Sequence, residues 1–168
     1  MIIRLETPRD VDSIRDITIA AFKDHPFSRQ TEHLIVDALR EAGALQVSLV
    51  AETGGDVVGH IAFSPAVVGD ALTGWFLLGP VSVHPDHQGS GVGRALVEAG
   101  LEVLRSRRAS GCVLVGDPQF YARFGFQQCG DATYPGVPAE NVLCLALGDE
   151  TPSGEIHHHP AFDASPAE

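Results

Sequence analysis

The segment with the clearest chemical potential is a glycine-rich loop between an apolar stretch and a helical pattern. It reads Gln88-Gly89-Ser90-Gly91-Val92-Gly93-Arg94. Glycines let the backbone turn tightly and approach a ligand with no Cβ in the way. Free amides at the start of the following helix, together with the helix dipole, favour an anion there. The loop is therefore predicted to bind a phosphate or pyrophosphate group.

Two common phosphate-binding loops do not match this segment. A P-loop requires a lysine followed by serine or threonine after its last glycine, whereas Arg94 and Ala95 stand here. A Rossmann fingerprint requires glycines at its first, third and sixth positions, and counting from Gly89 the sixth is Arg94. Nucleotide binding through either loop is thus disfavoured.

The loop instead resembles the Q/R-x-x-G-x-G/A signature of the GNAT superfamily of N-acetyltransferases, and the preceding Val81 to Pro85 looks like that family's strand. A stretch from Gly116 to Phe126 is similar to the family's second signature, in which a tyrosine, here Tyr121, precedes Gly-Phe. Residues 48–52, 58–65 and 154–162 are similar to the YhbS-like branch. For the loop taken alone, a simple glycine-rich turn is the alternative, but two signatures in the right order are much more specific.

The resemblance implies acetyl-CoA as cofactor and transfer of its acetyl group to a primary amine of a small molecule or protein. The backbone amide of Val81 is implied as the oxyanion donor, a type of contact typically worth about 3 kcal/mol. Tyr121 is implied as the general acid toward the leaving thiolate, since a phenol stays protonated at neutral pH; a packed aromatic is the alternative. The residues implied in cofactor binding are Val81, Val83, Gln88, Gly89, Ser90, Gly91, Val92, Gly93 and Arg94.

The general base is the departure from the family pattern. Many relatives carry a glutamate four residues before the Val81 position, where this chain has Leu77. His60, Glu52 and His84 are candidates by chemistry alone, each with a structural role as the alternative, and a water chain could also remove the proton. The absence of a glutamate at Leu77 supports a second hypothesis, a non-catalytic acyl-CoA-binding or regulatory module of the same fold. The retained Tyr121 and the intact loop argue against that hypothesis.

The hydrophobic periodicity predicts alternating strands and helices that would position these residues. The apolar stretch from Trp75 to Val83 is predicted as a central strand, joined by a helix to a parallel strand that begins at Cys112. The fold class is therefore α/β, or α+β by some schemes, and the resemblance implies a GNAT acyltransferase fold with a mixed central sheet, a splayed central strand and flanking helices. The predicted strands are 2–5, 47–52, 57–68, 75–83, 112–115, 126–129 and 141–147, and the predicted helices are 11–22, 30–42, 92–108 and 118–124.

The length of 168 residues suits one domain over residues 1–168, with an extended tail from about residue 148, where proline, glycine and acidic residues accumulate. Ile156 and Phe162 are the tail residues expected to dock on the domain. No stretch approaches the roughly 20 apolar residues of a membrane span, and the N-terminus does not resemble a signal peptide. A cytoplasmic protein without membrane contact is expected, and a homodimer is left open.

The formal net charge of −11 argues against nucleic-acid binding through bulk electrostatics. It would attract a cationic amine, although solubility alone is an equally good explanation. The three cysteines are expected to be reduced thiols, and a catalytic cysteine has no local support. Three adjacent histidines on an extended tail alternate in direction, so no metal site is predicted. These residues are Cys112, Cys129 and Cys144, and His157, His158 and His159.

Overall fold

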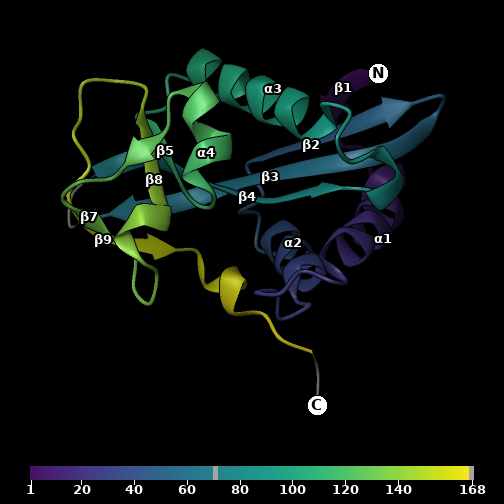
Figure 1. The fold of residues 1–168 in the computed structure, drawn as a ribbon, viewed down its shortest axis with the longest axis horizontal. Coiled ribbons are helices and arrows are strands. Elements are labelled where there is room, and N and C mark those ends of the chain that lie inside the picture. Colours follow the sequence, from purple (N-terminus) through teal and green to yellow (C-terminus); the bar gives the residue numbers. More distant parts are fainter. Residues whose placement is uncertain (70–71, 167–168) are drawn as a thin grey trace. The chain divides into compact units, whose positions relative to one another are not determined.

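The computed structural model describes residues 1–69 and 72–166. The chain divides into two compact units, each built from separate stretches of sequence. The strands β3 (Asp56–Val68) and β4 (Leu72–Val83) run through both of them (Figure 1). The first unit holds Met1–Phe63, Gly79–Leu101 and Pro160–Glu168, and the second holds Ser64–Leu78 and Glu102–His159.

The first unit contains an antiparallel sheet in which β1 pairs with β2 and β2 pairs with β3. The turn between β2 and β3 places Gly54 and Gly55 at φ values of 60° and 87°, as a two-residue hairpin turn requires. The further elements of this unit are β1 (Ile2–Leu5), η1 (Pro8–Asp10), α1 (Val11–Phe22), α2 (Glu32–Glu41), β2 (Val47–Thr53), η2 (Pro85–His87), most of α3 (Val92–Ser106) and η5 (Pro160–Asp163).

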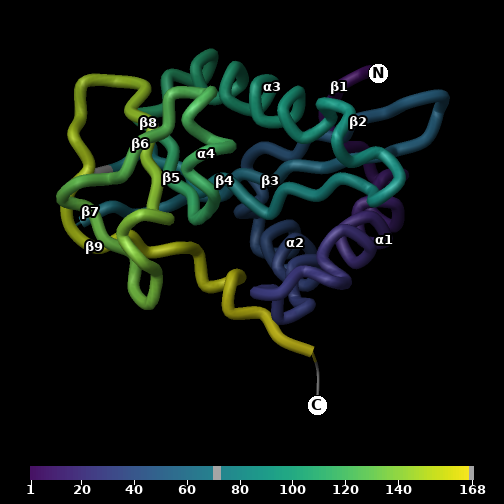
Figure 2. The backbone as a smooth tube through the Cα atoms, in the orientation of Figure 1, coloured from purple at the N-terminus to yellow at the C-terminus, as the bar shows by residue number. Residues whose placement is uncertain are grey.

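The apolar faces of α1 and α2 contribute two clusters to the core of the first unit. Ile14 of α1, Val36 of α2 and Val50 of β2 make one buried cluster. Ile35 and Leu39 belong to a second cluster, which η5 covers from the end of the chain. The C-terminal segment therefore lies against α2, as the tube in Figure 2 also shows.

The second unit combines parallel and antiparallel strand pairs. β4 pairs in parallel with β5, β5 pairs antiparallel with β8, and β8 pairs with β6. β9 pairs antiparallel with β3 and parallel with β7. The elements are β5 (Gly111–Val115), α4 (Pro118–Tyr121), η3 (Ala122–Phe124), β6 (Gln127–Gln128), β7 (Ala132–Thr133), η4 (Ala139–Asn141), β8 (Val142–Ala146) and β9 (Gly154–His158).

Most predicted elements are present, and the differences lie at their ends. The helix predicted from residue 30 begins at Glu32, because Gln30 adopts a positive φ of 62°. The helix predicted to reach residue 108 ends at Ser106, and Arg108 has a φ of 57°. The segment after residue 148 contains β9 and η5. Docking of Ile156 and Phe162 is confirmed, since Ile156 is 1% exposed and Phe162 packs against the second core cluster.

The expectation of three reduced thiols is wrong for Cys129 and Cys144, which form a disulfide with a Cα–Cα distance of 5.0 Å. Pairing of β6 with β8 places Gln127 opposite Cys144, and Cys129 comes directly after the end of β6, two residues beyond Gln127. Sequence spacing alone could not reveal this pairing. Cys112 is free and buried, as expected. Over the residues that the structure describes, no helix combines the length and apolar character needed to cross a membrane.

Candidate active site

The last part of β4 turns two backbone amides away from its antiparallel neighbour. The amide of His84, which follows β4, donates to the carbonyl of Val58 in β3 at 2.9 Å. This bond sets the register between the end of β4 and the start of β3. Antiparallel pairs alternate between bonded and non-bonded residues, so the N–H and C=O groups of Val81 and Val83 point to the opposite edge of β4. The Gln88 side-chain amide donates to the Val83 carbonyl at 3.0 Å, consistent with this direction.

The parallel pairing of β4 with β5 stops before it reaches that part of the strand. The register covers three pairs, the last of which joins Leu77 to Val113. β4 then continues to Val83, past a cis Gly79–Pro80 peptide. The predicted splay of the central strand is thus confirmed, and the backbone of Val81 and Val83 lies along an edge that this register leaves unpaired.

The glycine loop presents open backbone at the start of α3. Gly89 and Gly91 have φ values of 79° and 89°, and a Cβ built on either would meet no atom within 4 Å. The amide of Ala95 donates to the Gly91 carbonyl at 3.0 Å, so the amides of Val92, Gly93 and Arg94 precede the first full helical turn. Such amides lack partners within the helix and favour an anion. The loop therefore fits a pyrophosphate group.

Side chains of the loop hold its shape. Ser90 Oγ donates to the His87 carbonyl at 2.6 Å, and Gln88 is tied to β4 through the bond to Val83. Arg94 Nε donates to Glu98 Oε1 at 3.0 Å on an exposed face of α3. The backbone, more than these side chains, is the part of the loop that is available to a ligand.

Tyr121 belongs to the second unit and closes α4. The helix begins with Asp117, whose side chain accepts a hydrogen bond from the amide of Gln119 at 2.9 Å. A Cβ on Gly116 would lie 2.7 Å from the tyrosine ring, so only glycine allows the ring to pack there. Burial raises the pKa of Tyr121 to about 12, and the hydroxyl is a proton donor at neutral pH. The supporting roles of Gly116 and Asp117 were not anticipated, although the run Gly-Asp-Pro before a helix is a visible capping signal.

The base candidates all have structural partners. Leu77 is buried and apolar, so β4 supplies no carboxylate at that place. Glu52 accepts from Arg4 at 3.4 Å, and His84 Nδ1 accepts from the Asp86 amide at 3.1 Å. His60 is fully buried with Nε2 at 2.7 Å from the hydroxyl of Ser48.

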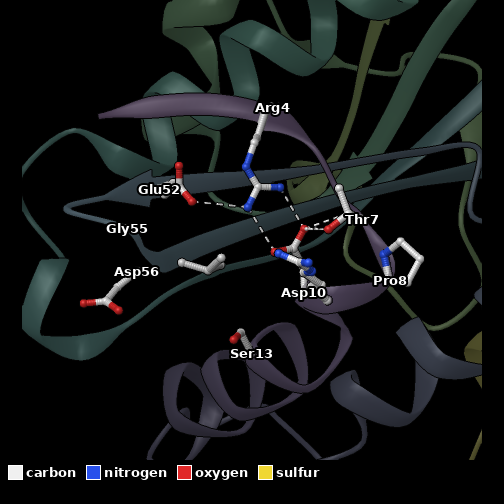
Figure 3. A pocket seen from close by; sticks show the side chains of 10 residues that line it. Arg4, Thr7, Pro8, Asp10, Ser13, Glu52, Gly55 and Asp56 are labelled. Carbon is white, nitrogen blue, oxygen red and sulfur yellow. Dashed lines mark hydrogen bonds and ion pairs between the residues drawn. The ribbon is translucent and has the colours of Figure 1, made fainter.

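A cavity of about 750 Å³ opens beside β1 and the start of α1, in the first unit. Figure 3 shows Arg4 between Asp10 and Glu52 at its wall. Hydrogen bonds from Arg4 and Thr7 outweigh burial and hold the pKa of Asp10 far below its usual range. None of the residues predicted to bind the cofactor lines this cavity, so it is separate from the predicted cofactor site.

The tail histidines take different partners. His158 Nδ1 makes a hydrogen bond with the hydroxyl of Tyr134, and His157 Nδ1 lies 3.8 Å from a carboxylate oxygen of Glu155. Over residues 1–69 and 72–166, no group of three or more histidine, cysteine or acidic side chains is arranged to hold a metal ion.

Comparison with known proteins places this geometry in a family. Residues 45–128 match the model of the acetyltransferase (GNAT) domain. The chain is 37% identical to the uncharacterized N-acetyltransferase YhbS of Escherichia coli over 168 residues, covering 95% of this chain and 98% of the relative.

Two solved structures agree with this match. A GNAT family acetyltransferase from Brucella melitensis, solved in complex with acetyl-CoA, is 49% identical with a TM-score of 0.86, over 96% of this chain and 97% of that one. YhbS from Escherichia coli, solved with CoA, is 32% identical with a TM-score of 0.82, over 97% and 92% of the two chains. The splayed strand, the open glycine loop and these similarities together show that the chain belongs to the GNAT family of acetyltransferases.

Proposed function

We propose that the protein is an acetyl-CoA-dependent N-acetyltransferase that modifies a primary amine of a small molecule or protein. The proposal rests on two backbone features that occur together in the first unit. One is the edge of β4 at Val81 and Val83, which the β4–β5 register leaves unpaired, and the other is the set of open amides at the start of α3. Relatives of the same family were solved with acetyl-CoA and with CoA, which supports the choice of cofactor.

Each predicted residue has a role in this proposal. The amides of Gly89 to Gly93 and of Arg94 bind the pyrophosphate, while Gln88 and Ser90 keep the loop in shape. Val83 pairs through its backbone with the pantetheine arm. The amide of Val81 donates to the thioester oxygen as negative charge develops there. Acetyl-CoA supplies an activated acyl group, which the acceptor amine attacks directly.

Tyr121 is proposed to protonate the departing thiolate. Its raised pKa keeps the phenol protonated throughout the physiological range, so the hydroxyl holds the proton that the thiolate takes up, while the same shift makes it a weaker acid than a free tyrosine. On this proposal residues 1–168 work as one acetyltransferase domain in the cytoplasm. A homodimer remains the assembly to test first.

The test is calorimetric titration of the purified protein with acetyl-CoA, with ATP and NAD as controls. Selective binding of acetyl-CoA is expected, followed by release of free thiol when amines are added. Absence of binding, in folded protein free of copurified coenzyme A, would overturn the proposal. Tight binding without transfer to any amine would favour the non-catalytic acyl-CoA-binding module, to which the apolar Leu77 points.

A further inference from the structure

Four hydrogen-bonded side chains in the first unit connect the buried core to solvent. Arg40 donates twice to the Glu6 carboxylate, Nε and Nη2 each at 3.0 Å from an oxygen. Ser48 Oγ donates to Glu6 Oε1 and lies 2.7 Å from His60 Nε2. The His60 side chain is 0% exposed, whereas that of Glu6 is 18% exposed. The chain therefore joins a buried imidazole to a carboxylate that water can reach.

The order of donors along this chain fixes the tautomer of His60. Burial would raise the pKa of Glu6, but hydrogen bonds from Arg40 and Ser48 outweigh it, and the pKa lies below its usual value. The ionised carboxylate only accepts, so the single hydroxyl hydrogen of Ser48 is committed to it. His60 Nε2 must then carry the hydrogen shared with Ser48.

The other ring nitrogen, Nδ1, is left with a buried lone pair. No described residue provides it with a hydrogen-bond partner. A buried polar atom without a partner costs stability, so it implies a ligand or water that completes it. The hydroxyl of Ser82 does not fill this place, because its hydrogen is directed to Thr18 Oγ1 at 3.4 Å.

The register of β3 against β4 places His60 one strand away from the proposed oxyanion donor. The bond from the His84 amide to the Val58 carbonyl sets the register, which places His60 opposite Ser82. Ser82 is the chain neighbour of Val81, the proposed oxyanion donor. Neighbouring strands are about 4.8 Å apart, so His60 stands one strand from that amide.

We propose that His60, Ser48 and Glu6 form a proton relay that removes the proton of the acceptor ammonium through a water at His60 Nδ1. The inference rests on the proposed function. The ammonium N–H bond breaks and its proton passes through the water to Nδ1. The Nε2 hydrogen moves to Ser48 Oγ, and the Ser48 hydrogen moves to Glu6 Oε1. Glu6 holds the proton while the acetyl group is transferred. Once the product has left, the shifts reverse: Glu6 returns its proton to Ser48, Ser48 returns its hydrogen to Nε2, and the Nδ1 proton leaves through the water, which restores the Nε2–H tautomer.

A relay suits this histidine better than a stationary base. The charged groups around it are Glu6 and Asp10, which raise its pKa, and Arg40, which lowers it, while burial dominates and brings the pKa to about 4. An imidazolium is therefore strongly disfavoured at neutral pH. When one proton leaves as another arrives, the ring never holds a net charge. Such a relay also removes the need for a carboxylate at Leu77.

The kinetic test compares Ser48→Ala with Ser64→Ala, since both serines are buried on the sheet and only Ser48 belongs to the relay. The acceptor probes, at high concentration, are methylamine, which is cationic at neutral pH, and hydroxylamine, which is not. For methylamine, Ser48→Ala should lower kcat roughly 10- to 100-fold at pH 7. Its log kcat should then rise with pH more steeply than that of wild type. Hydroxylamine and Ser64→Ala should show little change.

The outcomes separate the relay from the proposed function. If wild type binds acetyl-CoA and transfers to methylamine while Ser48→Ala matches Ser64→Ala, the relay is overturned. If Ser48→Ala does not fold, Glu6→Gln takes its place, because the amide keeps the shape but cannot take up the proton. Failure of wild type to bind acetyl-CoA is instead a failure of the proposed function.

A second measurement needs no acceptor. Two-bond ¹H–¹⁵N spectra of the histidine rings report which nitrogen carries the hydrogen. The His60 ring should show a protonated Nε2 and an unprotonated Nδ1 between pH 6 and pH 8, in a range about two to four units above its pKa of about 4. A hydrogen on Nδ1 would overturn the relay whatever the kinetics show.

Discussion

The role proposed for Tyr121 depends on its hydroxyl alone. Tyr121→Phe keeps the ring that packs beside Gly116 and Phe126, so the affinity for acetyl-CoA should change by less than about threefold. Loss of the general acid should lower kcat about 100-fold. Steady-state kinetics and calorimetry on the same preparation separate the two effects. A parallel loss of affinity would make the tyrosine a cofactor contact, and full activity would remove the acid assignment.

The lowered pKa of Asp10 predicts how the free energy of unfolding depends on pH. Its pKa is held below the unfolded value of about 3.9 by Arg4, so its contribution is present above that pH and is lost as the pH falls below it. Asp10→Asn should cost about 2 kcal/mol at pH 7. Urea unfolding should show a smaller difference from wild type at pH 3. Exposed Asp16→Asn is the control, and an equal effect of both variants at pH 7 would contradict the buried pairing.

At the scale of elements, the start of α3 makes a prediction about the cofactor loop. Gly91→Glu places a side chain and a negative charge in the space that the positive φ of 89° leaves open, and should lower acetyl-CoA affinity at least about 100-fold. Gly43→Glu is the matched control, because Gly43 has a φ of 69° and an equally open Cβ position after α2. Equal binding by the two variants would show that the loop does not hold the anion.

The disulfide that joins Cys129, just after β6, to Cys144 of β8 has an energetic consequence. Cys129 and Cys144 are separated by 15 residues, and closing a loop of that length stabilises the folded state by about 3 kcal/mol in the chain-entropy model. Reduction with dithiothreitol should therefore lower the free energy of unfolding by that order. Cys112→Ala should respond to reductant as wild type does, and Cys129→Ala/Cys144→Ala should not respond at all. An unchanged unfolding midpoint in reduced wild type would argue against the bond.

The elements were the most predictable part of this protein, because hydrophobic period and glycine position are local signals. The strand from residue 75 and the glycine loop follow from them directly. The disulfide and the Glu6–Ser48–His60 network depend on contacts between strands distant in sequence, which no local pattern encodes. The same limit applies to the candidate bases: the sequence offers His60, Glu52 and His84 by chemistry alone, and only the structure shows that His60 Nε2 contacts Ser48.

On the scale of the whole molecule, the protein and its cofactor carry charge of the same sign, because the chain is acidic and acetyl-CoA is an anion. With a net charge of −11, long-range electrostatics alone would repel acetyl-CoA. In the proposed binding mode, short-range backbone donors at β4 and at the start of α3 supply the attraction, because the field of their peptide dipoles is local. The net charge alone does not identify a ligand, because it is equally consistent with simple solubility. The family to which the chain belongs identifies the cofactor as acetyl-CoA.

The C-terminal segment packs against α2 and covers its apolar face. Ala161, Phe162 and Ala164 pack against the cluster of Ile35, Leu39 and Ala44. Phe162→Ala should lower the free energy of unfolding by about 1.5 kcal/mol, the lower end of the range for a large apolar side chain, because Phe162 is only partly buried. Phe27→Ala is the control, since Phe27 is 89% exposed and should cost almost nothing.

Urea unfolding of the two phenylalanine variants and of a chain truncated before Pro160 provides the measurement. The truncation should cost at least as much as Phe162→Ala, because it removes the alanine contacts as well. If Phe162→Ala and Phe27→Ala unfold at the same midpoint, the segment contributes no packing energy. A stability loss in truncated protein, with acetyl-CoA affinity retained at a temperature where it is folded, would make the segment a structural cover for α2 and leave the cofactor loop independent of it.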